Sequence, residues 1–491
     1  MVTPMLLDPI QCRKAILARD ARFDGRFFTG VLTTGIYCRP VCPARPPKAE
    51  NCRYYPSAAA AQAAGFRPCL RCRPETAPGL GAWRGASNTV SRAVSLIEAG
   101  ALDDGDVENL ADRLGVGERH LRRLFLKHLG ASPVSVAQTR RVHIAKQLIH
   151  ETTLPMTEIA LAAGFGSVRR FNEAMLALFG RPPTELRRIA GTGRSGHAGI
   201  TLSLGYRPPF DWSAILEFLS QRAIPGVERV EDGVWWRTIA MDGAAGDIEV
   251  SHEPERNRVR ATIRFPALAA LPRIIARIRQ VFDLDADPEA INSALSRDPR
   301  MAPLVAARPG LRVPGAWDSF ELAVRAILGQ QITVTAATRL AGEIARQWGE
   351  PYDGLALTRL FPSPERLSAA TIGGMPGSRA QSIVKLATAV SANPRLIDRA
   401  EDFETSINRL CALPGVGEWT ANDLAMRALR ETDAFPAADI GLMRALETNG
   451  RRPRPTELDQ ISQSWRPWRA YAAMHLWTAP YKKERSRELA A

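Results

Sequence analysis

The sequence lacks several features that mark large classes of proteins. Its 491 residues contain no apolar run of about 18 residues, the length that a membrane-spanning helix needs. Residues 1–11 have neither a basic start nor a long apolar core, so we expect no secretion signal. Low-complexity tracts are also missing. We therefore expect a cytoplasmic protein without membrane contact, long enough for three or four domains.

Cysteine is scarce, with only 7 residues in the chain, and five of them lie within the first 70 residues. Such clustering argues against a disulfide scaffold and indicates a metal site in a reducing compartment. Acidic residues are outnumbered, because 65 Lys and Arg face 51 Asp and Glu and leave a net charge of +14. This excess of positive charge favours a polyanionic partner such as nucleic acid.

Four of the clustered cysteines form two close pairs, Cys38-x3-Cys42 and Cys69-x2-Cys72, with 26 residues between them. Two such pairs can close a tetrahedral zinc site with four thiolate ligands. Arginine and proline crowd both pairs, whereas buried structural thiols have apolar neighbours. The sequence therefore predicts one zinc ion, and the alternative is a set of separately buried cysteines.

Residues 33–45 and 64–72, which contain these pairs, resemble the N-terminal zinc domain of the Ada methylation-response protein. The resemblance implies that the four cysteines bind zinc and that Cys38 accepts a methyl group from a DNA methylphosphotriester. Zinc keeps a thiol in the nucleophilic thiolate form. Methylation then removes one negative charge, so the affinity for DNA should rise. Arg45 and Arg71 are candidate phosphate contacts, or else solvated surface charges.

Residues 90–188 have a helical pattern with two similar units about 50 residues apart. In each unit an amphipathic helix, at 107–116 and at 156–163, leads through glycine into a polar helix, at 118–128 and at 168–178. Helix, glycine turn and polar helix predict a helix-turn-helix, whose second helix enters the major groove of DNA.

The second unit carries the pattern Ile159-Ala160-x3-Gly164-Phe165-x-Ser167 and resembles the AraC-type DNA-binding domain. The resemblance implies binding to promoter DNA. Arg122 and Arg169, on the second helix of each unit, are candidate DNA contacts because arginine suits base edges in the major groove. The alternative is a helical domain without a role in DNA binding.

From residue 200 the pattern changes to short alternating strands. The stretch Tyr206-Arg207-Pro208-Pro209-Phe210-Asp211-Trp212 resembles the start of AlkA-type DNA glycosylases and implies a small α+β domain. We expect strands at 200–204, 235–240, 246–252 and 258–265, and helices at 211–221 and 270–282.

Near the C-terminus, Leu413-Pro414-Gly415-Val416-Gly417 separates two helix-forming runs and predicts a hairpin between helices. Gly415 and Gly417 place no Cβ in the way and expose amides at a helix start, with Thr420 one turn further, so we expect a grip on a DNA phosphate. Asp439 follows about twenty residues later in a Pro/Ala setting. By itself such a residue is a helix cap or a surface group.

With residues 317–332, 375–380 and 465–477, the hairpin resembles the helix-hairpin-helix glycosylase superfamily, in its AlkA branch of 3-methyladenine DNA glycosylase II. The resemblance implies that the damaged base is flipped out of the duplex. It also implies that Asp439 stabilises the positive charge that develops on the sugar as the glycosidic bond breaks.

The same resemblance suggests further contacts. Trp419 and Trp477 are candidate aromatic contacts of a cationic base, with core packing as the alternative. Gln331 aligns near the residue that wedges into the duplex, or is a helix surface residue. The family also binds a monovalent cation through hairpin carbonyls, which correspond here to those of Cys411, Leu413 and Val416.

The chain departs from these families at three points. Trp419 stands where bifunctional glycosylases carry a lysine nucleophile, so we expect hydrolysis without strand cleavage. Asp423 and Ile440 stand where the AlkA pattern has tyrosines, so we expect a less aromatic pocket and leave the range of lesions open. The Pro-Cys-His-Arg motif of the methyltransferase domain of Ada is absent.

These patterns predict a multidomain, mainly α-helical fold with α+β modules, in which a regulator is fused to a DNA repair glycosylase that removes N-alkylated purines such as 3-methyladenine. We expect double-stranded DNA and RNA polymerase as partners and no oligomer. One alternative is a methylation-activated transcription factor with an inactive glycosylase half, and another is a repair enzyme that uses the helix-turn-helix units only for localisation.

Linkers are expected at 79–87 and 191–199. The expected domains are a zinc-binding methyl acceptor at 1–78, a helix-turn-helix domain at 88–190, an α+β domain at 200–284 and an all-α helix-hairpin-helix glycosylase domain at 285–491.

Overall fold

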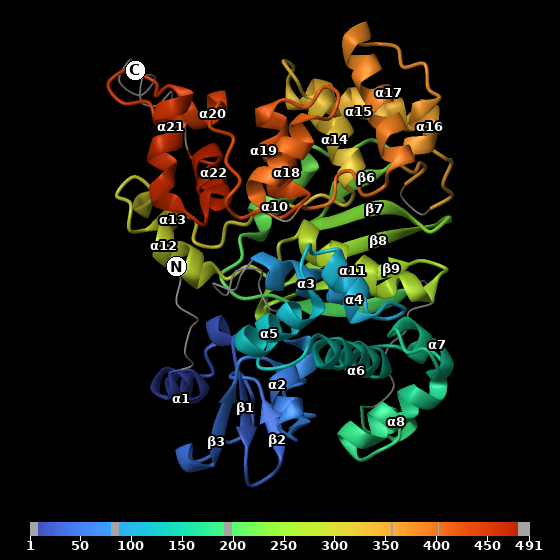
Figure 1. Cartoon of the computed structure of the whole chain (residues 1–491), viewed down its shortest axis with the longest axis vertical. Coiled ribbons are helices and arrows are strands. Elements are labelled where there is room, and N and C mark those ends of the chain that lie inside the picture. The colour runs from blue at the N-terminus through green and yellow to red at the C-terminus, as the bar shows by residue number, and fades with distance from the viewer. Residues whose placement is uncertain (1–7, 80–87, 191–198, 355–356, 401, 480–491) are drawn as a thin grey trace.

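The computed structural model describes residues 8–79, 88–190, 199–354, 357–400 and 402–479. The two expected linkers lie outside these ranges, apart from residues 79 and 199. Figure 1 shows the all-α part of the glycosylase half at one end, a five-stranded sheet in the middle, and the N-terminal units at the other end. No helix in the described part of the chain is long and apolar enough to cross a membrane.

The first unit contains a four-stranded sheet with the order β3-β1-β2-β4, which sequence analysis did not anticipate. Its strands have only two to four residues, too few for a recognisable alternation of apolar and polar positions. The β2 strand pairs with β4 in parallel, and the other pairs are antiparallel. The elements are α1 (Pro9–Ala18), β1 (Phe28–Val31), β2 (Ile36–Cys38), β3 (Cys52–Tyr55), α2 (Ala58–Ala63) and β4 (Arg67–Pro68).

The next segment is all helical and contains both expected helix-turn-helix units. Gly115 and Gly164 stand in their turns with φ of +70° and +82°, in the left-handed region that glycine adopts without strain. Ser167 caps the second polar helix by accepting a hydrogen bond from the Arg170 amide. The helices are α3 (Asn88–Glu98), α4 (Val107–Asp112), α5 (Glu118–Leu129), α6 (Pro133–Glu151), α7 (Met156–Ala162), α8 (Val168–Phe179) and α9 (Pro183–Ala190).

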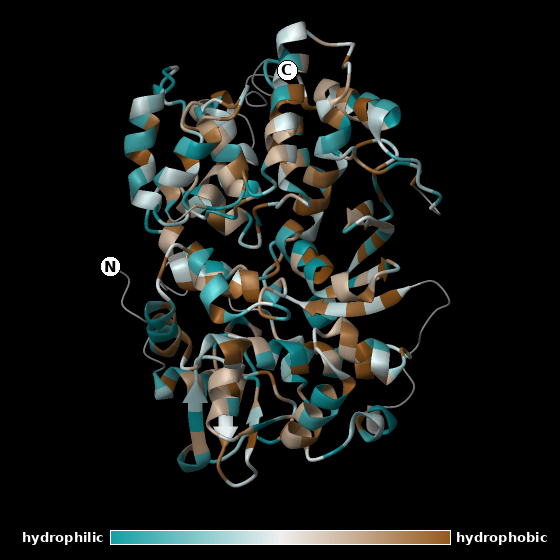
Figure 2. Cartoon of the chain, turned by 45° about the vertical axis from the view of Figure 1, so that its right-hand side comes forward, coloured by the Kyte–Doolittle hydropathy of each residue, from teal (hydrophilic) through white to brown (hydrophobic). Residues whose placement is uncertain are grey.

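The middle of the molecule is an antiparallel sheet with the order β5-β9-β8-β7-β6. Along β9, buried residues alternate with more exposed ones, as expected of a strand with one buried face. Figure 2 shows the same alternation of brown and paler residues along the strands. The bounds are β5 (Ile200–Gly205), α10 (Trp212–Ser220), β6 (Glu228–Glu231), β7 (Val234–Met241), β8 (Ala244–Glu253), β9 (Arg258–Arg264) and α11 (Leu271–Val281).

The rest of the glycosylase half is all helical, which confirms the expected fold class. Its buried side chains form one large apolar cluster that also takes in Ile224 and Val227 beside α10. The helices are α12 (Pro288–Leu295), α13 (Ala302–Ala307), α14 (Ser319–Leu328), α15 (Val334–Trp348), α16 (Pro364–Ser368), α17 (Gly377–Ala392), α18 (Phe403–Cys411), α19 (Glu418–Arg427), α20 (Ile440–Ala445), α21 (Pro455–Ser462) and α22 (Arg469–Trp477).

The long helix α6 connects the two halves of the protein. Apolar residues of the second helix-turn-helix unit and of the five-stranded sheet belong to one buried cluster. On α6, the Gln147 side chain donates to the Ser203 carbonyl of β5 at 2.8 Å, and Glu151 accepts from the Ser203 amide at 3.0 Å. The helix-turn-helix segment and the sheet therefore share a core.

A buried ion pair ties the same helix to the first unit. The ammonium of Lys146 lies 2.8 Å from the Glu75 carboxylate, and neither side chain is exposed. Arg73 also pairs with Glu75, at 3.0 Å, and reaches Glu151 of α6 at 2.7 Å. Burial by itself would raise the pKa of the Glu75 carboxyl, but the charges of Lys146 and Arg73 lower it to about 2.

We expect Lys146→Met to lower the free energy of unfolding of the N-terminal half by about 3 kcal/mol, because it leaves a buried carboxylate short of a partner. The measurement is denaturant unfolding followed by circular dichroism. Adding Glu75→Met should restore much of the loss. As a control, Arg169→Met removes only the exposed pair with Glu173. An unchanged midpoint in the single Lys146 variant would contradict the role of the pair.

Candidate active site and metal centre

The parallel pairing of β2 with β4 brings the two cysteine pairs together. Tyr37 lies opposite Pro68 in this register. Cys38 and Cys69 are the next residues after this pair, so they lie side by side where the two strands end. The four sulfur atoms all lie within 4.8 Å of one another. Zinc bonds to thiolate at about 2.3 Å, so four ligands of one tetrahedral ion must lie at such spacings. The cluster of Cys38, Cys42, Cys69 and Cys72 therefore fits a zinc ion, as predicted.

The surroundings of the cysteines fix their positions. The Arg39 amide donates to the Cys72 sulfur at 3.4 Å, and the Arg39 side chain pairs with Asp24. Cys69 and Cys72 are buried, whereas Cys38 and Cys42 are only partly covered. Two of the four cysteine residues are therefore more exposed than the others. Arg45 and Arg71 are both exposed nearby in sequence.

The carboxylate of Asp439 is held by three N–H donors. Asp439 is the N-cap of α20, where Oδ1 accepts from the Leu442 amide at 2.9 Å. The Trp477 indole donates to the same oxygen at 2.8 Å, and the Trp419 indole donates to Oδ2 at 3.0 Å. The structure thus brings together three residues that the sequence separates by up to 58 positions. Sequence analysis expected the two indoles near a base but did not anticipate that their N–H edges bind the acid.

The hairpin between α18 and α19 forms as expected. Gly415 has a φ of +76°, and a Cβ there would lie 2.8 Å from Ser382 Cβ, so a larger residue does not fit. A Cβ on Gly417, the N-cap of α19, would meet no atom within 4 Å, and this glycine is exposed. The Gln330 side chain donates to the Gly415 carbonyl at 2.8 Å and ties the hairpin to the end of α14. Sequence analysis missed this contact.

Two further expected residues lie near the hairpin. Gln331 is exposed in the turn after α14, and its backbone φ is +60°, a value that residues other than glycine rarely adopt. Thr420 is 3% exposed, and its hydroxyl lies 3.5 Å from the Gln330 side-chain nitrogen. Gln331 is therefore accessible from solvent, whereas Thr420 is covered.

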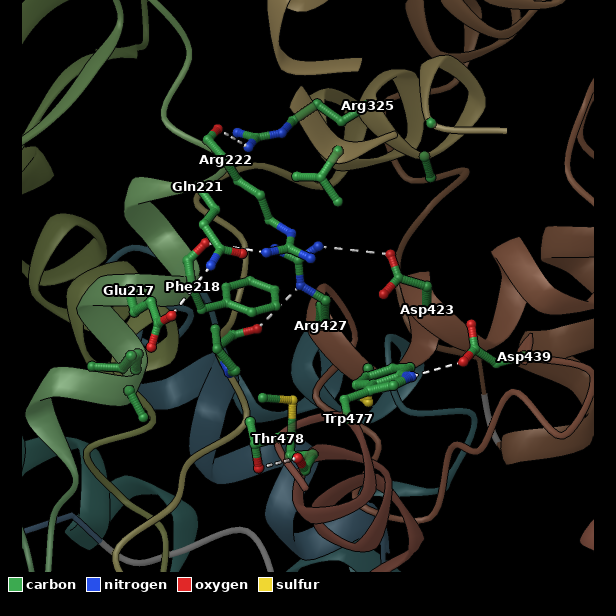
Figure 3. Close-up of a pocket in the computed structure, with 18 of the residues that line it drawn as sticks. Glu217, Phe218, Gln221, Arg222, Arg325, Asp423, Arg427, Asp439, Trp477 and Thr478 are labelled. Atoms are coloured by element: carbon green, nitrogen blue, oxygen red, sulfur yellow. Dashed lines mark hydrogen bonds and ion pairs between the residues drawn. The ribbon is translucent and has the colours of Figure 1, made fainter. Parts of the chain in front are cut away.

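A cavity of about 710 Å³ opens beside Asp439. Trp419, Asp423 and Arg427 line it from α19, at a spacing of four residues that puts them on one face of the helix. Figure 3 shows Asp439 and Trp477 together, apart from the guanidinium groups of Arg222 and Arg427. Neither arginine was singled out from the sequence, although the spacing on α19 could have indicated Arg427. Ile440, in contrast, is exposed and does not line the cavity.

The candidate DNA contacts of the helix-turn-helix units lie on the surface. Arg122 of α5 pairs with Glu118, and Arg169 of α8 pairs with Glu173 at 2.8 Å. Both are pairs between successive helical turns on exposed faces, which contribute little to stability. In Figure 1, α8 lies at the opposite end of the molecule from α20 and α22, and α5 lies between the two ends, so these arginines are on helices away from Asp439.

Sequence models of three families match successive parts of the chain. The metal binding domain of Ada matches residues 11–75, a helix-turn-helix domain matches residues 110–189, and the AlkA N-terminal domain matches residues 201–318. The fold of the glycosylase half is also similar to that of a solved 3-methyladenine DNA-glycosylase from Archaeoglobus fulgidus. That comparison gives a TM-score of 0.50 at 23% identity and covers 56% of this chain and 96% of the other.

Two curated relatives match over most of their own lengths. The chain is 34% identical to DNA-3-methyladenine glycosylase 2 of Escherichia coli over 280 residues, which is 56% of this chain and 96% of the relative. It is 41% identical to the probable bifunctional transcriptional activator/DNA repair enzyme AlkA of Mycobacterium tuberculosis over 476 residues, covering 95% of this chain and 96% of the relative. With the zinc cluster, the helix-turn-helix units and the glycosylase fold in one chain, this protein belongs to the family of bifunctional transcriptional activator/DNA repair enzymes of the AlkA type.

Proposed function

We propose that this protein is a DNA glycosylase that hydrolyses the N-glycosidic bond of N-alkylated purines such as 3-methyladenine, fused to a transcriptional activator that responds to DNA methylation. The observation that carries the proposal is the Asp439 carboxylate, oriented by two indole N–H groups in a cavity beside a helix-hairpin-helix. The names of the relatives from Mycobacterium tuberculosis and Escherichia coli support both activities.

The chemistry follows from the contacts of Asp439. An N-alkylated purine carries positive charge and leaves easily, so the enzyme needs little acid catalysis. As the bond breaks, its electron pair goes to the base, and the sugar carbon C1′ becomes positive. A fixed carboxylate stabilises that charge without reorganising. A water oxygen then bonds to C1′ and its proton is released. The three N–H donors to Asp439 keep its oxygens in place for this role.

The residue at position 419 decides the outcome of the reaction. A lysine in the second helix of the hairpin would attack C1′ and lead to strand cleavage. Here Trp419 stands in that helix, and its indole carries no nucleophilic amine. Water is then the only nucleophile that the reaction requires. We infer a monofunctional enzyme that leaves an abasic site.

The hairpin would hold the DNA backbone. Gly417 is exposed at the start of α19, where a helix N-terminus favours a phosphate. A monovalent cation bound by the carbonyls of Cys411, Leu413 and Val416 would add to this grip. The Leu413 carbonyl accepts from the Val416 amide at 3.1 Å and has a second lone pair for such an ion. Gln331 would enter the space that the flipped nucleotide leaves.

In the regulatory half, Cys38 would act as a methyl acceptor. Its sulfur forms a bond to the methyl carbon of a methylphosphotriester, the carbon–oxygen bond breaks, and the triester becomes an ordinary phosphodiester. Zinc held by Cys38, Cys42, Cys69 and Cys72 would supply the thiolate that this transfer needs. Cys38 belongs to the less buried pair of the cluster, which suits contact with DNA.

Loss of one thiolate charge would strengthen DNA binding in this half. Arg45 and Arg71 would contact phosphates near the modified site, and Arg122 and Arg169 would meet the promoter through α5 and α8. At the promoter, RNA polymerase would be the protein partner of such an activator. The boundaries 1–78, 88–190, 200–284 and 285–491 remain our proposal for the domains.

We expect Asp439→Asn to reduce the release of 3-methyladenine from alkylated DNA by about hundredfold or more, because the charge that stabilises C1′ is lost. DNA binding, measured by fluorescence anisotropy, should persist. Asp402→Asn is a matched control, because Asp402 is also an N-cap, on α18 and outside the cavity. Full activity of the Asp439 variant would contradict the role of this carboxylate. Absence of base release by the wild-type protein would instead favour an activator with an inactive glycosylase half.

We expect DNA that contains methylphosphotriesters to transfer one methyl group to Cys38, detectable by mass spectrometry of the peptide that carries it. Promoter affinity should rise after the transfer, because repulsion from the backbone falls. Cys52→Ser, outside the metal cluster, should not change the transfer. Absence of a modified Cys38 peptide would contradict the proposed switch, and unchanged promoter affinity would leave localisation as the role of the helix-turn-helix units.

We expect metal analysis of the purified protein to find one zinc ion per chain. Cys69→Ser should lose the ion, because three thiolates and a hydroxyl hold zinc less tightly than four thiolates. Cys12→Ser should keep it, because Cys12 is buried on α1 outside the cluster. If the intact purified protein contains no zinc, the proposed metal centre is contradicted.

A further inference from the structure

The cavity continues well beyond the catalytic carboxylate. On α19, Trp419 binds Asp439 near the hairpin, Asp423 follows one turn later and Arg427 follows another turn later. Eight residues of α-helix span about 12 Å. This distance exceeds the length of a two-ring base whose glycosidic bond lies at Asp439. A flipped methylated purine therefore leaves the Arg427 end of the cavity unfilled.

That end of the cavity is positively charged. Five arginines line the cavity, but three of them are committed to acceptors elsewhere. Arg325 pairs with Glu228 and Glu321, each at 3.1 Å. Arg308 pairs with Asp211 at 2.8 Å, and Arg312 donates to the Arg207 carbonyl at 2.6 Å and to the Asp283 carbonyl at 3.3 Å. The remaining two arginines are Arg222 and Arg427.

Arg222 and Arg427 are incompletely paired within the described part of the chain. The Arg427 guanidinium donates to the Pro314 carbonyl through Nε at 3.3 Å and lies 3.7 Å from the Asp423 carboxylate. The Arg222 guanidinium makes one hydrogen bond, to the Phe218 carbonyl at 3.3 Å. Each guanidinium group has five N–H donors. Most of their donors are therefore available to a ligand or to water.

The two guanidinium groups share one aromatic ring. The Phe218 ring centre lies 3.8 Å from the Arg222 guanidinium carbon and 4.9 Å from that of Arg427. Figure 3 shows both groups beside this ring, facing the cavity. Burial, and then the nearby charge of Arg427, lower the pKa of Arg222 to about 10. Asp423 and Glu217 also line this part of the cavity, but Asp423 lies 3.7 Å from Arg427 and Glu217 accepts from Gln221 at 3.4 Å. Two like charges in such a site favour the arrival of an anion.

We propose that Arg222 and Arg427 form a subsite for a carboxylate at the end of the N-alkyl substituent of a damaged purine, as in a carboxymethyl adduct. The charged base would lie between Asp439 and the indoles, and its anionic tail would reach the two guanidinium groups. This inference rests on the proposed glycosylase function, and the hydrolysis itself is unchanged. Asp423, where the AlkA pattern has tyrosine, orients Arg427.

A DNA phosphate does not suit this position. The hairpin lies at the N-terminal end of α19, whereas Arg427 is the last residue of that helix. The proposed phosphate grip and the two arginines are thus separated by the length of the helix. A carboxylate carried on the edge of the flipped purine that points away from its glycosidic bond would extend toward this end of the cavity.

The test compares three duplex DNA substrates that carry purines with N-methyl, N-carboxymethyl or N-carbamoylmethyl groups. The carbamoylmethyl group matches the carboxymethyl group in size but is neutral. Released bases are quantified by mass spectrometry to obtain kcat/KM. The wild-type protein should prefer the carboxymethyl over the carbamoylmethyl purine by about tenfold, the size of one charge-assisted hydrogen bond.

Arg222→Gln and Arg427→Gln should each remove most of this preference, with every rate divided by the methylpurine release of the same variant. Arg366→Gln should keep the preference, because this arginine pairs with Glu350 at 3.0 Å outside the cavity. Equal wild-type rates for the charged and neutral adducts would overturn the subsite, even if a variant fails to fold. Failure of the proposed glycosylase function would give a different result, because the wild-type protein would then release no methylpurine either.

Discussion

One carboxylate lies where three helices of the glycosylase half meet. Asp439 accepts hydrogen bonds from the start of α20 and from indoles on α19 and α22, so three helices must meet at this point. The large apolar cluster that packs these helices together is what makes the meeting possible. Because α19 begins at the hairpin and carries Trp419, one helix joins the hairpin to a residue that holds Asp439.

The regulatory and repair halves are joined by packing as well as by the chain. The α6 helix contacts the first unit through the Lys146–Glu75 pair and the central sheet through Ser203. Strand β2, which ends at Cys38, and helix α22, which ends at Trp477 in the lining of the cavity, nevertheless lie toward opposite ends of the molecule (Figure 1). A single DNA segment at one of these sites does not have to block the other, which suits a protein that both senses and repairs alkylation.

The two ends of the cavity differ in charge and would suit different parts of a ligand. Asp439 and the two indoles form an acidic and aromatic end that suits a cationic base. Arg222 and Arg427 form a basic end that suits an acceptor or an anion. A tyrosine at position 423 would offer a ring, whereas Asp423 offers a charge that holds Arg427 in place.

The sequence by itself determined the features that depend on local spacing. The cysteine pairs, both helix-turn-helix units, the hairpin and most strands of the central sheet follow from turn residues and periodicity within short windows. Tertiary structure decided which distant residues meet. No local pattern joins Trp477 to Asp439, Lys146 to Glu75, or Arg222 of the α10 region to Arg427 of α19. These contacts arise because packing of the apolar faces sets the positions of whole elements, and only then do their polar side chains acquire partners.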